Sequence, residues 1–329
     1  MSQLVSLLKT CGVACTLLAA AIGIARAQAP DDYPRAPVTL LVPYPAGAAT
    51  DTAARNFAPK LSQYLGQPVI VDNVGGAGGA LAVQRLLRSK ADGYTLLFGT
   101  NNETVLIPLV NSSIGYKTTE LRPIGLVGTT SSVLVANAQL PANNIDELVD
   151  HLRRHPDSLN LGHPGIGTFQ HLIAASIAQR AGVQWAHIPY KGASPLMTDL
   201  LGGQIELAVV TLPSAVTYLN QGGLKSLGLI KATRDPRLPD LATINEGNSI
   251  KDMDADLWLG LFAPRGLPDS VGAVLHTALN RALEDTEFQA AQLKMGFSTP
   301  APGPADSFAT YVAEQTEQFA KLAATVQAD

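Results

Sequence analysis

Three stretches of small residues, each between an apolar run and a helical pattern, are the parts of this sequence best suited to binding chemistry. They are Pro-Ala-Gly-Ala-Ala-Thr-Asp at 45–51, Gly-Gly-Ala-Gly-Gly-Ala at 75–80 and Gly-Ile-Gly-Thr at 165–168. Glycine permits positive φ angles and a close approach of the backbone to a ligand. A helix N-terminus adds unpaired amides and about half a positive charge. The loops therefore predict carboxylate or phosphate binding; the alternative is that they are ordinary tight turns.

The patterns that other chemistries require are missing from the sequence. A dinucleotide fingerprint that starts at Gly76 and Gly78 fails, because Leu81 stands where the third glycine is needed. There is no G-x-S-x-G nucleophile elbow, no H-E-x-x-H pair and no catalytic cysteine. We therefore expect a protein that is not an enzyme and that uses no cofactor.

The histidines give two further candidates. His151 and His155 have the spacing of a metal pair on a helix, but two arginines lie between them, so a solvated helix face is favoured and no metal site is expected. His163 and His171 flank the third loop and are able to donate to an anion. His171, in the first turn of a helix, is the better candidate, and a structural role for His163 is an equal alternative.

The elements that position these loops alternate between strands and helices, which indicates an α/β fold with a largely parallel sheet. Continuous apolar runs predict strands that are covered on both faces. The expected strands are 38–42, 69–71, 94–99, 132–136, one ending near 162, 185–189, 205–210, 224–230 and 257–263. The expected helices include 51–65, one after Asn144, one carrying His171, 269–283 and roughly 305–326.

The first 27 residues are typical of a cleavable export signal. Lys9 gives a positive start, 11–25 is apolar, and Ala-Arg-Ala at 25–27 matches a cleavage site, so the mature chain is expected to begin at Gln28. The alternatives are an uncleaved anchor and a lipidated cysteine. The apolar run is shorter than the roughly 20 residues of a membrane span, and Cys15 lacks the Leu-led lipobox and lies too early in the run. We therefore expect a periplasmic protein without a membrane anchor.

The expected mature chain contains no cysteine and is acidic. Cys11 and Cys15 both lie in the signal, so neither disulfides nor thiol chemistry is available afterwards. Loss of Lys9 and Arg26 takes the net charge from −4 to −6. This balance argues against nucleic acid or an anionic membrane as a partner. An anion must be held by local features such as helix N-termini.

Taken together, the motifs resemble the tripartite tricarboxylate transporter substrate-binding proteins, also called the Bordetella uptake gene family. The resemblance extends from Tyr33 to the last helix. Its markers are 42–51 (Val-Pro-Tyr-Pro-Ala-Gly-Ala-Ala-Thr-Asp), 73–79, 92–95 (Asp-Gly-Tyr-Thr), 167–172 (Gly-Thr-Phe-Gln-His-Leu), 189–192 (Pro-Tyr-Lys-Gly), 199–204 (Asp-Leu-Leu-Gly-Gly-Gln) and 258–264.

The resemblance implies a type II periplasmic binding protein fold, with two α/β lobes joined by crossing strands and the ligand cleft between them. We place the signal peptide at 1–27, lobe 1 at 28–129 plus 256–329, and lobe 2 at 130–255. The resemblance further implies a protein that holds a small carboxylate by backbone amides and water and delivers it to membrane transporter subunits. We expect this protein to be a monomer. A module that presents ligand to a sensor kinase is one alternative, and a periplasmic hydrolase is another.

The candidate ligand-binding residues come from the loops, from the helix start that follows the third loop, and from two further positions, Asn101 and Tyr190. They are Ala46, Gly47, Ala48, Ala49, Thr50, Asp51, Gly78, Asn101, Gly165, Gly167, Thr168, Phe169, His171 and Tyr190. Lys191 is more typical of a surface charge. Phe169 stands where the family commonly has serine, and an aromatic ring there can stack on a flat ligand. This predicts an aromatic dicarboxylate such as terephthalate over citrate, unless Phe169 turns inward as core.

Overall fold

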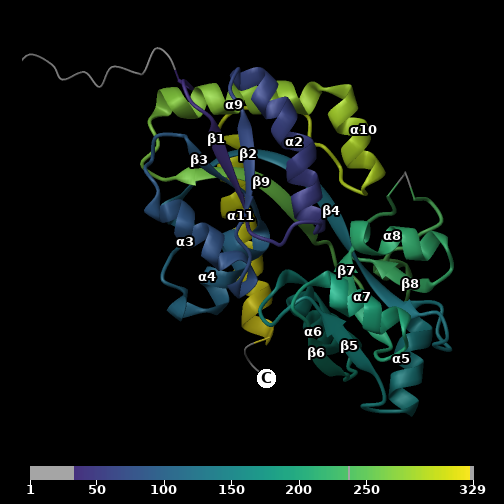
Figure 1. Cartoon of the computed structure of the whole chain (residues 1–329). Helices are drawn as coiled ribbons and strands as arrows, with labels where there is room; N and C mark the ends of the chain where they lie inside the picture. The colour runs from purple at the N-terminus through teal and green to yellow at the C-terminus, as the bar shows by residue number, and fades with distance from the viewer. Residues whose placement is uncertain (1–32, 236–237, 327–329) are drawn as a thin grey trace, which may run out of the picture. The chain divides into compact units, whose positions relative to one another are not determined.

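The computed structural model describes residues 33–235 and 238–326 (Figure 1). The expected signal peptide, residues 1–27, lies outside the described residues. Among those that are described, no helix is long and apolar enough to cross a membrane.

The first part of the sheet is parallel, and its middle strand is buried on both faces. The edge strand at 69–73 is only partly covered, with Ile70 54% exposed, so the prediction that 69–71 is covered on both faces is wrong. Strand β1 (Val38–Val42) lies between β2 (Val69–Asn73) and β3 (Thr95–Thr100) and is parallel to both. Leu40 and Leu41 point to opposite faces of β1, and both are fully buried. The apolar run of this strand is therefore covered on two sides, as predicted. Helices α2 (Ala49–Leu65) and α3 (Ala80–Arg88) follow β1 and β2 and pack against the sheet.

Two long antiparallel strands link this part of the sheet to the next. The first part of β4 (Leu121–Asn137) pairs with β9 (Asp256–Pro264), up to the Ser131–Asp256 pair. From Ser132 onward, β4 pairs instead with β7 (Leu207–Thr211) and β8 (Leu224–Leu229). One strand thus belongs to both parts of the sheet.

The second part of the sheet repeats the α/β pattern. Strand β5 (Asn160–His163) runs parallel to β6 (Ala186–Pro189) and to β7. The full strand order is β2-β1-β3-β9-β4-β7-β5-β6, with β8 beside β4. The helices of this part are α5 (Ile145–Arg154), α6 (Phe169–Ala181), α7 (Ala193–Leu201) and α8 (Leu212–Asn220). The predicted α/β class is confirmed, but the sheet is mixed and not largely parallel, because β4 and β9 pair antiparallel with all of their neighbours.

The C-terminal helices return to the first part of the sheet. They are α9 (Asp269–Glu284), α10 (Thr286–Lys294) and α11 (Ser307–Val326). Helix α11 packs on β4 and continues to α6 (Figure 1). Its Phe308 closes an aromatic cluster with Trp258 and Phe262 of β9, with ring centroids 5.3 to 6.0 Å apart.

Candidate functional site

The first predicted loop follows β1 and is held in shape by Asp51, in the first turn of α2. The Asp51 carboxylate is 2% exposed. It accepts hydrogen bonds from the Gly47 amide and from Asn73 Nδ2, both at 2.8 Å, and pairs with Arg55 at 3.0 Å. Burial alone would raise the pKa of Asp51, but these three donors outweigh it and hold the pKa below its usual value. Asp51 therefore shapes the loop, and its carboxylate is already engaged within the protein.

The start of α2 is an uncapped helix N-terminus. Its cap residue, Ala48, has no side-chain oxygen and makes no side-chain cap hydrogen bond. Ser, Thr, Asp or Asn at this position would pair one of the first amides. Ala48 and Ala49 are half-buried, whereas Ala46 and Gly47 are exposed. The amides of this first turn thus carry the positive end of the helix dipole to a partly accessible surface.

The second loop, between β2 and α3, packs on the first. Gly79 has a φ of +102°, and a Cβ on it would lie 3.0 Å from the Cβ atoms of both Pro43 and Glu103. Only glycine permits both this backbone conformation and this approach. Gly78 also has a positive φ and is exposed. The first two loops therefore lie together at the carboxyl ends of parallel strands, where α/β sheets bind ligands.

The third loop, between β5 and α6, has several of its amides already paired. The Thr168 amide donates to Gly165 O at 3.3 Å. The Phe169 amide donates to Asn102 Oδ1 at 2.5 Å, and the His171 amide to Thr168 Oγ1 at 3.4 Å. The Thr168 hydroxyl in turn donates to Gly165 O at 2.7 Å. The sequence predicted that these amides bind a ligand, but in the structure they donate to partners within the protein.

Asn102 connects the third loop to the first, a role that the sequence did not reveal. Besides accepting from Phe169, it donates from Nδ2 to the Tyr44 hydroxyl at 3.2 Å. The preceding residue, Asn101, was predicted to bind ligand. It is fully buried and donates to Asp256 O at 3.2 Å. Asn101 Oδ1 has no hydrogen-bond partner among the described residues. The only sequence signal was a pair of asparagines directly after an apolar strand.

Glu103 is a buried carboxyl group beneath the first two loops, and the sequence did not single it out either. It is fully buried in the π-helical turn Asn102–Leu106. Its carboxyl accepts from the Thr100 amide, from Thr100 Oγ1 at 2.7 Å and from the Tyr44 hydroxyl at 3.0 Å. Burial raises the pKa of Glu103 to about 7, although these hydrogen bonds oppose the shift. Burial and the Glu103 charge also raise the pKa of Tyr44.

The side chain of Phe169 is fully buried at the start of α6. Its ring packs edge-on against Phe319 of α11, with centroids 5.6 Å apart. A ring with no exposed face has no surface on which a flat ligand can stack. Phe169 therefore turns inward as part of the core, which was the alternative to ligand stacking that the sequence left open.

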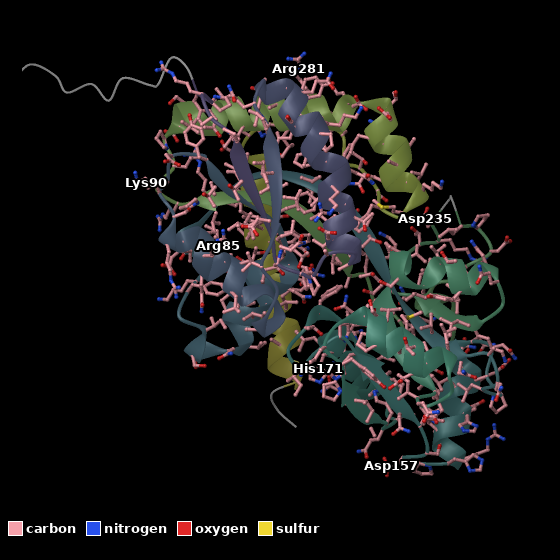
Figure 2. All side chains as sticks on the ribbon, in the orientation of Figure 1. Arg85, Lys90, Asp157, His171, Asp235 and Arg281 are labelled. Atoms are coloured by element: carbon pink, nitrogen blue, oxygen red, sulfur yellow. The ribbon has the colours of Figure 1, made fainter. Side chains whose placement is uncertain are left out.

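Two other predicted residues have partners inside the second part of the sheet. Tyr190 donates its hydroxyl to Asp199 Oδ2 at 2.8 Å. His171 Nδ1 lies 3.2 Å from the Gly167 amide, which donates to it. Figure 2, which labels His171, shows it where α6 begins, beside the end of α11. The predicted residues therefore fall in one region of connected loops, but many of their polar groups support the loops themselves.

Comparison with known proteins places this arrangement in a family. Residues 53–327 match the family model "Tripartite tricarboxylate transporter family receptor". The chain belongs to this receptor family. The resemblance drawn from the loop motifs is thereby confirmed, and as a family member the chain is a binding protein and not an enzyme.

Solved structures agree with the family. The periplasmic binding protein BugD is 32% identical with a TM-score of 0.81, covering 90% of this chain and 99% of that one. Rpa4515 of R. palustris, solved with adipate, is 29% identical with a TM-score of 0.84 over 90% and 99% of the two chains. MatC of Rhodopseudomonas palustris, with bound malate, is 28% identical with a TM-score of 0.81 over 88% and 100%. The fold is therefore that of periplasmic binding proteins.

Proposed function

We propose that this receptor captures a small aliphatic dicarboxylate at the start of α2. The observation that carries the proposal is the uncapped first turn at Ala48–Thr50, whose loop Asp51 fixes through the Gly47 amide. A carboxylate there accepts charge-assisted hydrogen bonds from backbone amides. Two structural relatives were solved with dicarboxylates, adipate and malate. Because the chain has a net negative charge, its overall field does not attract a carboxylate, and the attraction must come from such local donors.

The buried position of Phe169 favours an aliphatic ligand over terephthalate. The expectation of an aromatic guest rested on stacking against this ring, and the ring is fully buried. Without that surface, an aromatic ligand gains no stacking energy from Phe169. The ligand's second carboxylate or polar groups then meet the loop Gly165–His171, with Tyr190 and Asn101 nearby as further candidates.

The proposed mechanism is capture between two lobes, followed by delivery. Lobe 1 comprises 28–129 and 256–329, and lobe 2 comprises 130–255, with β4 crossing between them and β9 beginning at the boundary, at Asp256. The hydrogen bond from the Phe169 amide to Asn102 joins residues on the two sides of this division. Ligand contacts made only in a closed form shift the balance toward it. We propose that transporter subunits in the membrane recognise that form, after export of the chain through its cleavable signal peptide.

Calorimetric titration of the protein with adipate, malate, citrate and terephthalate tests the ligand class. We expect saturable 1:1 binding of at least one aliphatic dicarboxylate and weak or no binding of terephthalate. Tight terephthalate binding would overturn the aliphatic preference alone. Absence of binding by every carboxylate would overturn the proposed function. Loss of dicarboxylate uptake on deletion of the gene would support transport; intact uptake with loss of a transcriptional response would favour a sensor kinase as the partner.

Replacing Asp51 tests the place of binding. Asp51→Ala removes the acceptor that holds the Gly47 amide and Asn73, so the loop loses its fixed shape. Each such loss costs about 1–3 kcal/mol, so dicarboxylate affinity should fall about tenfold or more in calorimetry. Thr52→Ala, at an exposed position one residue later, is the matched control and should bind normally. Equal affinity of the Asp51 variant and the control would show that this loop is not the site.

A further inference from the structure

Three histidines from three elements meet beside the third loop. His163 ends β5, His171 lies in the first turn of α6, and His187 lies in β6. Since Leu161 pairs with His187, and alternate residues of a strand share a face, His163 and His187 lie on the same face of adjacent parallel strands. One ring nitrogen from each of the three side chains lies within 4.8 Å of the others.

His163, the fully buried member of the three, has a ring nitrogen whose lone pair has no hydrogen-bond donor among the described residues. His163 Nδ1 is 2.9 Å from Gly165 O, and since a carbonyl only accepts, Nδ1 carries the ring proton. Nε2 is therefore the unprotonated nitrogen. It is fully buried and has no hydrogen-bond partner among the described residues. A buried acceptor without a partner is costly, so a group that fills it is expected.

The other two rings are neutral and able to adjust. Burial lowers the pKa of His163 to about 4 and also holds the pKa values of His171 and His187 below their usual value. His171 is half-buried and His187 is exposed, so both can move toward a shared ligand. Three neutral imidazoles around one point do not repel a cation, unlike His151 and His155 with their neighbouring arginines.

We propose that His163, His171 and His187 form a binding site for a divalent transition-metal cation of the zinc type. Imidazole suits zinc, copper and nickel ions, whereas calcium and magnesium prefer oxygen ligands. Zinc–nitrogen bonds of about 2.0–2.1 Å in a tetrahedral site place the nitrogen atoms roughly 3.3 Å apart. The rings of His163 and His171 are stacked, with centroids 4.3 Å apart, so the lone pairs, which lie in the ring planes, do not yet converge. The present spacing, within 4.8 Å, closes to that value when the half-buried His171 ring rotates toward the ion and the exposed His187 moves with it. The Gly165 carbonyl orients His163 in the way that outer partners commonly orient metal-bound histidines.

Binding at this site also acts on the third loop. The contact from the Gly167 amide to His171 Nδ1 is long at 3.2 Å. A cation at Nδ1 displaces that amide directly, and a cation at Nε2 moves the ring proton to Nδ1, which also removes the hydrogen bond. Three protein ligands leave a fourth position open to water or to another oxygen ligand. Metal binding thus changes the hydrogen bonding of the same loop that contributes to the proposed ligand site.

Titration of untagged, chelator-treated protein with Zn²⁺ alone tests the proposal, with Co²⁺ absorption spectra to report tetrahedral coordination. We expect one ion per chain and a loss of affinity of at least about tenfold in His163→Gln. His187→Gln, at an exposed position, should weaken binding equally and keeps the test valid if the buried variant misfolds. The His151→Ala/His155→Ala double variant is the matched control, since those rings lie 5.0 Å apart elsewhere on the surface, and it should bind as the parent does.

Two outcomes would overturn the proposal. One is the absence of saturable 1:1 binding of either ion by the parent protein. The other is binding that survives His163→Gln and His187→Gln but disappears in the double variant, which would assign the ion to the helix α5 pair. No carboxylate is added in these titrations, so failure of the metal site and failure of the proposed function are read separately.

Discussion

Raising the pH from about 4.5 to 8 should lower the free energy of unfolding of the parent protein by about 3 kcal/mol more than that of its Glu103→Gln variant. Burial raises the pKa of Glu103 from 4.5 to about 7 in the folded protein. Between these values the folded state binds more protons than the unfolded state, so stability falls as pH rises. The contribution is fully present below the unfolded pKa and is lost above about pH 7. A tenfold difference between the acid constants of the folded and unfolded states corresponds to about 1.4 kcal/mol.

Glutamine reproduces the protonated form of this side chain. Its carbonyl accepts from the Thr100 amide, and its amide donates where the neutral carboxyl would, toward Tyr44 and Thr100. Urea denaturation at several pH values measures the difference directly. Glu314→Gln, at an exposed position of α11, is the control and should follow the parent curve. Identical pH dependence in the parent and in Glu103→Gln would contradict the prediction, because it would mean that folding does not raise the pKa of Glu103.

The same ionisation bears on ligand capture. Above about pH 7 a negative charge appears beneath the loop that Gly79 and Pro43 form against Glu103. Under the proposed function, this charge opposes a carboxylate at the start of α2, since few screening waters reach a fully buried group. The parent protein then loses affinity through neutral pH, and Glu103→Gln does not.

The sequence predicted the elements that carry continuous apolar runs. Strand 38–42 and the helix that follows were placed within two residues, because buried parallel strands have a strong signal. Strand β4 was placed from 132 only, although it begins at Leu121. Pro123, Gly125 and Gly128 in its first part are typical of loops, but register shifts between Pro123 and Gly125 and between Leu126 and Gly128 accommodate them. The short helices α7, α8 and α10 were not predicted.

The candidate site was predicted as loops but not as hydrogen bonds. Small residues after parallel strands indicated where helix N-termini would lie. Nothing in the local pattern shows that the Phe169 amide is paired by Asn102, because these residues are 67 positions apart. Glu103 stood between Asn102 and Thr104, just ahead of an apolar run, as one charged residue without a motif. The histidine cluster joins three elements, so the spacing rules that disfavoured His151 and His155 did not detect it.

Phe169→Ala should lower the free energy of unfolding by about 3–5 kcal/mol, because it leaves a cavity where a buried aromatic ring now packs. The ring is fully buried against Phe319. In thermal unfolding, a loss of this size corresponds to a fall in Tm of roughly 10 °C. Phe169→Leu fills most of the space and should cost much less. Differential scanning calorimetry of the three proteins provides the comparison.

Ile166→Ala is the matched control, three residues earlier and 78% exposed, and its stability should stay within about 0.5 kcal/mol of the parent. Under the proposed function, Phe169→Leu should also keep the parent affinity for an aliphatic dicarboxylate, since the ring contacts core and not ligand. A ligand-stacking ring would behave in the opposite way: its removal would leave Tm unchanged and abolish the binding of an aromatic acid. That result would return terephthalate to the first place among the ligands and would require Phe169 to leave Phe319 when the ligand binds.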